Sequence, residues 1–280
     1  MYKVIIIFLA LFSFTQTYSQ ESELEFGLLN MASGAVVGGI GAVINKKPNQ
    51  KFHKVLGKGF LQGALGGYLV FESKRLLRTF VKKENYAYVW PSKIVNSAGI
   101  SIIENAAANR NFWNRWHLNI GFTRLDIYTK DKLRLKYRIM PFSLLYAVNI
   151  QIVEGNIDFN KSLKLGVLVF TPRQSGLSSF KSDGAQISNH IALRDNPGLE
   201  IEAHEVLHVY QQNQFSGFNS YFIKTDNYLK RNYKWYSFYK KVFHTDFNTP
   251  IFSGIYRLGE ISAGSYRVNI FEKEAYFFTR

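Results

Sequence analysis

Two histidines and a glutamate, His204, Glu205 and His208, stand close together in the last third of the chain. On an α-helix, side chains four residues apart lie on the same face, so His204 and His208 can reach a single ion. Glu205 lies beside them, where its carboxylate can act on a water held by that ion. The spacing therefore predicts a helical zinc site, with two imidazole ligands and Glu205 as the general base.

A catalytic zinc site needs a third protein ligand. The chain has no Cys, and Gln211 and Gln214 stand where the longer form of the motif would place a Gly and a third His. We therefore expect a carboxylate from a later helix. Glu272 is the first candidate and Glu274 is the alternative, both within 265–276, which has a helical pattern. Gln211, about one turn further along the motif helix, is expected to orient a ligand.

The residues HEVLHVYQQ, followed by EKEAY, resemble the gluzincin family of zinc metallopeptidases, in the form of the minimal zincin-like domains of bacterial proteins. The resemblance covers 186–280. It implies Zn²⁺ as the cofactor, a polypeptide as the substrate and hydrolysis of peptide bonds as the reaction. It also implies the zinc ligands His204, His208 and Glu272 and the general base Glu205. Tyr276 replaces the Asp of the family pattern, which leaves Glu274 as the alternative register.

Hydrolysis of a peptide bond also needs a group that stabilises the developing oxyanion. A tyrosine, histidine or arginine side chain can donate a hydrogen bond to that oxygen. The sequence offers five candidates and does not choose among them: Tyr210, His190, His244, Tyr266 and Arg267.

Stretches rich in β-branched and aromatic residues precede the motif and are typical of strands. These stretches are HLNIGF, RLDIYT, LRLKYRI, SLLYAVNIQIV and SLKLGVLVF. They predict four to six strands over 117–193, in a central antiparallel or mixed sheet. The last strand, 186–193, should lead into the motif helix, with Asn196 as the N-cap and Pro197 as the first helical residue.

Small residues recur every four positions in two apolar segments, 27–44 and 55–71. On helices this spacing makes a smooth groove that lets two backbones approach closely. The segments therefore predict a helical hairpin. It either packs against the rest of the protein or inserts in a membrane, and the interruption of the second segment by Lys58 favours packing.

Two further stretches combine basic residues with apolar or aromatic ones. The first, 72–115, predicts a solvated basic helical face, a loop at Trp90 and Pro91, and a helix from Ile94 to Ala108. The second, 218–247, predicts one or two amphipathic helices whose aromatic stripe packs in the core. The alternative for 218–247 is a surface that binds anionic ligands or headgroups.

The first residues, MYKVIIIFLALFSFTQTYSQ, are typical of a secretory signal peptide. Lys3 supplies the positive charge and Val4 to Phe14 the apolar core, with cleavage expected near Ser19. The mature protein is therefore expected in the periplasm, the envelope or the medium. The predicted organisation is a signal peptide at 1–19, a Gly-rich helical region at 20–115 and a zincin-like α+β domain at 116–280.

The formal net charge of +15 at pH 7 favours contact with anionic surfaces such as a membrane. Nucleic acid is not an expected partner, because the chain is predicted to be exported and has no nucleic-acid-binding motif. Two functions from different classes follow. The first is an exported zinc metallopeptidase, and the alternative is a non-catalytic structural or binding protein of the envelope or membrane with a vestigial motif. The oligomeric state leaves no mark on the sequence.

Overall fold

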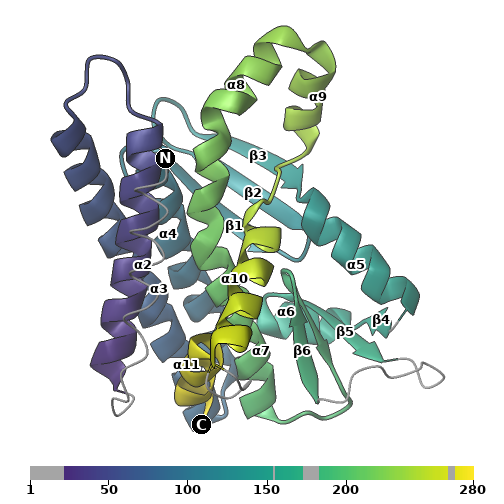
Figure 1. Cartoon of the computed structure of the whole chain (residues 1–280). Coiled ribbons are helices and arrows are strands. Elements are labelled where there is room, and N and C mark those ends of the chain that lie inside the picture. Colours follow the sequence, from purple (N-terminus) through teal and green to yellow (C-terminus); the bar gives the residue numbers. More distant parts are fainter. Residues whose placement is uncertain (1–21, 154, 173–182, 264–268) are drawn as a thin grey trace.

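The computed structural model describes residues 22–153, 155–172, 183–263 and 269–280, and confirms the predicted α+β class (Figure 1). The described part of the chain begins with a layer of helices: α2 (Glu23–Ile44), α3 (Phe52–Lys83), the short 3-10 helix η2 (Tyr86–Tyr88) and α4 (Val89–Ala107). The predicted signal peptide, 1–19, and its cleavage near Ser19 lie outside the described residues.

The predicted helical hairpin is confirmed in α2 and α3, and glycines allow its close packing. A Cβ atom on Gly63 would lie 2.1 Å from the backbone oxygen of Gly34, and one on Gly67 would lie 2.2 Å from that of Asn30. Only a residue without a side chain fits at such distances. By length and composition α2 could cross a membrane, but 50% of its most apolar window is buried inside the protein.

The basic stretch after the hairpin departs from its prediction in two places. Lys74 lies on α3 and is fully buried rather than solvated, because it pairs with Glu274 near the other end of the chain. Trp90 and Pro91 belong to the first turn of α4 rather than to a loop. Proline is tolerated there because the first N–H groups of a helix have no partner within it. The predicted helix from Ile94 to Ala108 is the remainder of α4.

Two small sheets stand in place of the single predicted one. The first is antiparallel, in the order β1 (Arg115–Ile120), β2 (Thr123–Tyr128) and β3 (Arg134–Ile139). These strands correspond to three of the predicted ones. Asp126 of β2 is buried and accepts hydrogen bonds of 2.9 Å from Arg124 and 2.8 Å from Arg138. One face of this sheet is therefore built from charged side chains.

The second sheet is mixed, in the order β4 (Gly155–Ile157), β5 (Leu168–Pro172), β7 (His190–Leu193) and β6 (Gly184–Ile187). Strands β5 and β7 are parallel, and the other pairs are antiparallel. The single strand predicted for 186–193 is instead parts of β6 and β7, joined by a turn in which Ser188 has a φ of 61°. Within the described residues, β6 is an edge strand beside the motif helix.

Two segments predicted as strands are wholly or partly helical. SLLYAVNIQIV lies in α5 (Pro141–Val153), and SLKL lies in α6 (Phe159–Leu165), which a left-handed Gly166 ends before β5. The start of α5 is capped by Asp246, which accepts hydrogen bonds of 3.0 Å from the N–H of Phe142 and 2.9 Å from that of Ser143. A local apolar pattern cannot reveal a cap that comes from so far along the chain.

The motif lies on α7 (Leu199–Gln214), which begins later than predicted. Gly198, with a φ of 78°, stands at the N-cap position, and no side chain caps the helix. Asn196 has a φ of 52° and lies in the turn that connects β7 to α7. The prediction of Asn196 as the N-cap and Pro197 as the first helical residue is therefore wrong. Asn is one of the few residues that tolerates this left-handed backbone, which explains its presence.

The remaining elements are helical: η3 (Phe215–Phe222), α8 (Ile223–Asn232), α9 (Lys234–Val242), α10 (Asn248–Ala263) and α11 (Ile270–Thr279). The helices predicted for 218–247 are thus confirmed, but their aromatic residues do not all pack in the core. Trp235 and Phe238 are 64% and 68% exposed. Helices α7, α10 and α11 gather towards one end of the molecule, whereas α8 and α9 project at the other (Figure 1).

Candidate metal centre

Two imidazole rings face each other on one side of α7. The Nε2 atoms of His204 and His208 are 3.0 Å apart, and the rings are nearly perpendicular, at 84°. Both side chains are buried, because α10, α11 and β6 pack against α7. The i, i+4 spacing and this packing together hold two nitrogen ligands in one place.

Glu272 of α11 lies against both rings. Its Oε1 is 3.1 Å from Nε2 of His208, and its Oε2 is 3.3 Å from Nε2 of His204. The three atoms that could bind a metal lie within 4.8 Å of one another. The docking of α11 on α7 therefore brings together two parts of the sequence that are far apart.

This set of donor atoms fits a metal ion. Oε2 of Glu272 is buried and, apart from its 3.3 Å contact with Nε2 of His204, has no polar partner in the described part of the chain. Two imidazole nitrogens and a carboxylate oxygen, with no thiolate, form a ligand set that Zn²⁺ accepts in catalytic sites. A cation among them would bind the lone pairs that now face each other, and would compensate for the burial of the carboxylate.

The protonation states of Glu272 and His204 favour ligation, whereas His208 must lose a proton to bind a metal. Although burial opposes it, hydrogen bonds with His204 and His208 lower the pKa of Glu272. Burial lowers the pKa of His204, whereas the hydrogen bond with Glu272 raises the pKa of His208 despite its burial. At neutral pH the carboxylate is therefore ionised and His204 is neutral, which are the forms that bind metals.

Glu274, the alternative third ligand, points elsewhere. Its Oε2 lies 2.8 Å from Nζ of the buried Lys74, and its Oε1 accepts a hydrogen bond of 2.6 Å from Asn30. Side chains two residues apart on a helix do not face the same way. Glu272 thus reaches the histidines, while Glu274 ties α11 to α2 and α3.

Gln211 connects these two groups of residues. Its Oε1 lies 2.8 Å from Nδ1 of His208, and its Nε2 donates a hydrogen bond of 2.9 Å to Oε2 of Glu274. Because the amide oxygen can only accept, Nδ1 of His208 is the donor in this pair. In the neutral ring, the other nitrogen, Nε2, then carries the lone pair on the side of Glu272, as a metal ligand requires.

Glu205 lies beneath the edge strand β6 and is buried. Gln186 of β6 gives it a backbone hydrogen bond, and a Cβ atom on Gly184 would lie 2.8 Å from its Cγ. The absence of a side chain at Gly184 therefore makes room for the carboxylate. Burial raises the pKa of Glu205 to about 7. A group with such a pKa can accept a proton and return it near neutral pH.

The three predicted oxyanion candidates that the structure describes do not gather at this cluster. Tyr210 is fully buried and lies 3.2 Å from a serine hydroxyl of α4, His190 is buried in the second sheet, and His244 borders a separate pocket. Tyr266 and Arg267 lie outside the described residues.

Two tyrosines at the cluster have roles that the sequence does not indicate. Tyr256 of α10 donates a hydrogen bond of 2.5 Å to Oε1 of Glu272. Tyr276, which replaces the Asp of the family pattern, packs its ring 4.7 Å from that of His204. No motif marks Tyr256, because its partner is determined by the packing of α10 against α11.

Comparisons of the chain with protein-family models, with curated proteins and with solved structures find no match. A functional conclusion therefore depends on the chemistry of the residues themselves.

Proposed function

We propose that the protein is an exported zinc metallopeptidase of the gluzincin type. The main support is the convergence of His204, His208 and Glu272, whose ligand atoms lie within 4.8 Å of one another. Glu205 adds a buried carboxylate next to the ligands, with a pKa of about 7. The net charge of +15 supports a location at an anionic envelope surface.

Each residue has a separate task in the proposed reaction. When bound, Zn²⁺ would supply Lewis acidity, which lowers the pKa of a water and polarises a carbonyl group. Glu205 accepts the proton of the water as its oxygen attacks the carbonyl carbon, and returns that proton to the leaving amine nitrogen. Tyr256 and Gln211 hold Glu272 and His208 in orientation through the hydrogen bonds described above.

The position of β6 supports a polypeptide as the substrate. An extended peptide can add to the edge of a sheet through backbone hydrogen bonds. In the described part of the chain β6 is an edge strand, and it lies directly over Glu205. A peptide aligned with β6 would therefore pass the general base.

The metal is tested by the zinc content of the purified mature protein, measured by elemental analysis. We expect about one zinc per chain in the wild type. Loss of a residue that only orients a ligand lowers zinc affinity about 10- to 100-fold. Glu272 is proposed as a direct ligand, so Glu272→Gln should lower the zinc affinity at least as much and reduce the zinc content. Glu200→Gln is the matched control, because Glu200 is exposed on the same helix. A wild type without zinc would contradict the proposal.

The reaction is tested with Glu205→Gln and an unfolded protein as substrate. This variant keeps both histidines and Glu272, so it should bind zinc as the wild type does. Cleavage should fall by about 10²- to 10⁴-fold, the range expected for loss of a general base. Equal cleavage rates in the two proteins would exclude Glu205 from this role.

A non-catalytic protein of the envelope or membrane is the second candidate. Its support is one face of α3, where Leu61, Leu65 and Tyr68 are 71%, 45% and 43% exposed. Apolar side chains grouped on a surface mark sites of interaction. This candidate predicts that the protein sediments with lipid vesicles, that Leu61→Gln weakens sedimentation, and that Glu205→Gln has no effect on it.

A further inference from the structure

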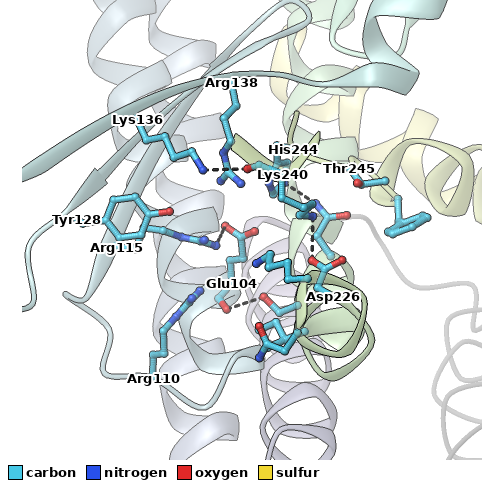
Figure 2. A pocket seen from close by; sticks show the side chains of 16 residues that line it. Glu104, Arg110, Arg115, Tyr128, Lys136, Arg138, Asp226, Lys240, His244 and Thr245 are labelled. Atoms are coloured by element: carbon cyan, nitrogen blue, oxygen red, sulfur yellow. Dashed lines mark hydrogen bonds and ion pairs between the residues drawn. The ribbon is translucent and has the colours of Figure 1, made fainter. Parts of the chain in front are cut away.

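A second site lies where the first sheet meets α4, η3, α8 and α9, and it shares no residue with the metal cluster. It is a cavity of about 230 Å³ with a strongly polar lining (Figure 2). Six of its lining residues are cationic: Arg110, Arg115, Lys136, Arg138, Lys230 and Lys240. Only two lining residues, Glu104 and Asp226, are acidic. The cavity therefore carries an excess of positive charge.

Part of this charge is neutralised within the protein. Arg115 lies 3.1 Å from Glu104, Lys240 lies 2.8 Å from Asp226, and Arg138 pairs with Asp126 behind the cavity. Although burial opposes it, Glu104 and Asp126 raise the pKa of Arg115. These pairs account for half of the cations.

The other three cations have no carboxylate within 4 Å in the described part of the chain. Nζ of Lys136 donates only to the backbone oxygen of Lys240, at 2.9 Å. Arg110 is the most informative, because its Nη2 is buried and has no hydrogen-bond partner. Figure 2 shows its side chain directed towards the space that Glu104 and Arg115 also face.

Arg110 is also held in position. Its Nε donates a hydrogen bond of 3.0 Å to Oδ1 of Asn105, which fixes the guanidinium and leaves the donor Nη2 unpaired in the described part of the chain. Burial lowers the pKa of Arg110 to about 9, so the group is still charged at neutral pH. Burying a charged donor without a partner is unfavourable. An anion bound in the cavity would remove this cost.

We propose that this cavity binds the phosphate group of a small anionic ligand. The guanidinium of Arg110 presents donors that match a phosphate oxygen, and Lys136 and Lys230 supply charge for a dianion. A volume of about 230 Å³ suits a phosphate with a small substituent rather than a polymer. The phosphate could belong to a soluble phosphomonoester or to a lipid headgroup.

Exposed aromatic residues near the cavity support a lipid headgroup as the source of the phosphate. Trp235 and Phe238 lie on α9, which also contributes Lys240 to the cavity. Exposed aromatic rings next to lysines suit the interface of a membrane. A lipid headgroup would thus reach the cavity while these rings contact the acyl boundary.

The proposal is tested by calorimetry at constant ionic strength, with inorganic phosphate and glycerol phosphate as probes. We expect saturable binding of one anion per chain to the full-length mature protein. Arg110→Gln should weaken this binding at least tenfold, and Arg110→Lys should restore part of it. Arg231→Gln is the matched control, since Arg231 is exposed on α8, does not line the cavity, and should leave the affinity within twofold.

Lys136→Gln gives a second, less buried variant, and should also weaken binding at least threefold. Circular dichroism checks that each variant is folded. Sedimentation with vesicles of phosphatidic acid, compared with phosphatidylcholine, distinguishes the two sources: wild-type binding that Arg110→Gln abolishes indicates a headgroup. Lack of saturable binding to either soluble probe, or equal binding by wild type and folded Arg110→Gln, would overturn the proposal. None of these measurements depends on zinc or on peptide cleavage.

Discussion

At the scale of single residues, the amide of Gln211 links the candidate metal centre to the helical layer. One end of this amide accepts the Nδ1 proton of His208, and the other donates to Glu274, which in turn pairs with Lys74. Such contacts behind a ligand select its tautomer and its orientation. The position of the His208 ring is therefore coupled to an ion pair between α3 and α11.

Replacing Gln211 with Ala should weaken zinc binding about 10- to 100-fold, because Nδ1 of His208 loses its acceptor and the ring can rotate. The affinity is measured by competition with a chromophoric chelator. Gln214→Ala is the control, since Gln214 is buried on the same helix but contacts the hairpin instead. Equal affinities in the wild type and Gln211→Ala would show that the amide does not orient the ring.

At the scale of elements, the contact between α2 and α3 depends on positions without side chains. Gly34, Gly63 and Gly67 bring the two backbones together, and Asn30 and Lys74 of the same helices then reach Glu274. The hairpin thus helps to hold α11 in place. Because α11 carries Glu272, the packing of the hairpin affects the candidate metal centre although the hairpin contributes no ligand.

The hairpin offers a matched pair of glycines for a test. Gly63→Ala should lower the free energy of unfolding by about 1–3 kcal/mol, because the new methyl group overlaps the backbone of α2. Gly57→Ala, also in α3 but with nothing within 4 Å of its Cβ position, should raise it by up to ~1 kcal/mol. Urea unfolding of both variants measures the difference, and equal effects would refute the close packing.

At the scale of the whole molecule, buried titratable groups make the fold sensitive to acid. Burial lowers the pKa of His117 and His190 to about 4, below the value of about 6.5 expected for unfolded histidine. As the pH falls below 6.5, the unfolded chain binds protons that the folded one does not, so stability is lost. The pKa of Glu104 is lowered by arginines despite its burial, so this loss continues below pH ~4.5.

Stability should therefore fall between pH 7 and pH 5, although the raised pKa of Glu205 partly offsets the loss, because the folded chain binds a proton there in this range. Each of His117 and His190 should contribute about 2 kcal/mol to the decrease, since one pKa unit corresponds to about 1.4 kcal/mol. Urea unfolding at both pH values measures the change in the free energy of unfolding between them. In His190→Gln, which lacks one of these groups, the decrease should be smaller by about 2 kcal/mol. If the decrease in this variant equals that of the wild type, the pKa of His190 in the folded protein is the same as in the unfolded chain.

The site could be located from the sequence because its geometry is largely local. His204, Glu205 and His208 share one helix, and the i, i+4 rule places the two rings together. Elimination and the family resemblance make Glu272 the first candidate, but only the packing of α11 separates it from Glu274. Tyr256 could not be foreseen, since its contact with Glu272 depends on a third helix.

The errors in the predicted fold have a common physical cause, which is tertiary contact. The spacing of small residues predicts the hairpin correctly, and β-branched and aromatic residues predict β1 to β3. The local pattern fails at α5, whose first turn is capped by Asp246 from a distant segment. It also treated Lys74 as solvated, because its buried partner Glu274 lies two hundred positions away. Local patterns contain no information on such partners.

The separation of Glu272 from its partners has a consequence for the order of events in synthesis. A ribosome completes His204 and His208 well before it reaches Glu272, and α11 can dock only after that. A growing chain therefore holds two histidines without their carboxylate. The metallopeptidase that we propose would therefore stay inactive until α11 docks on α7 and completes the ligand set.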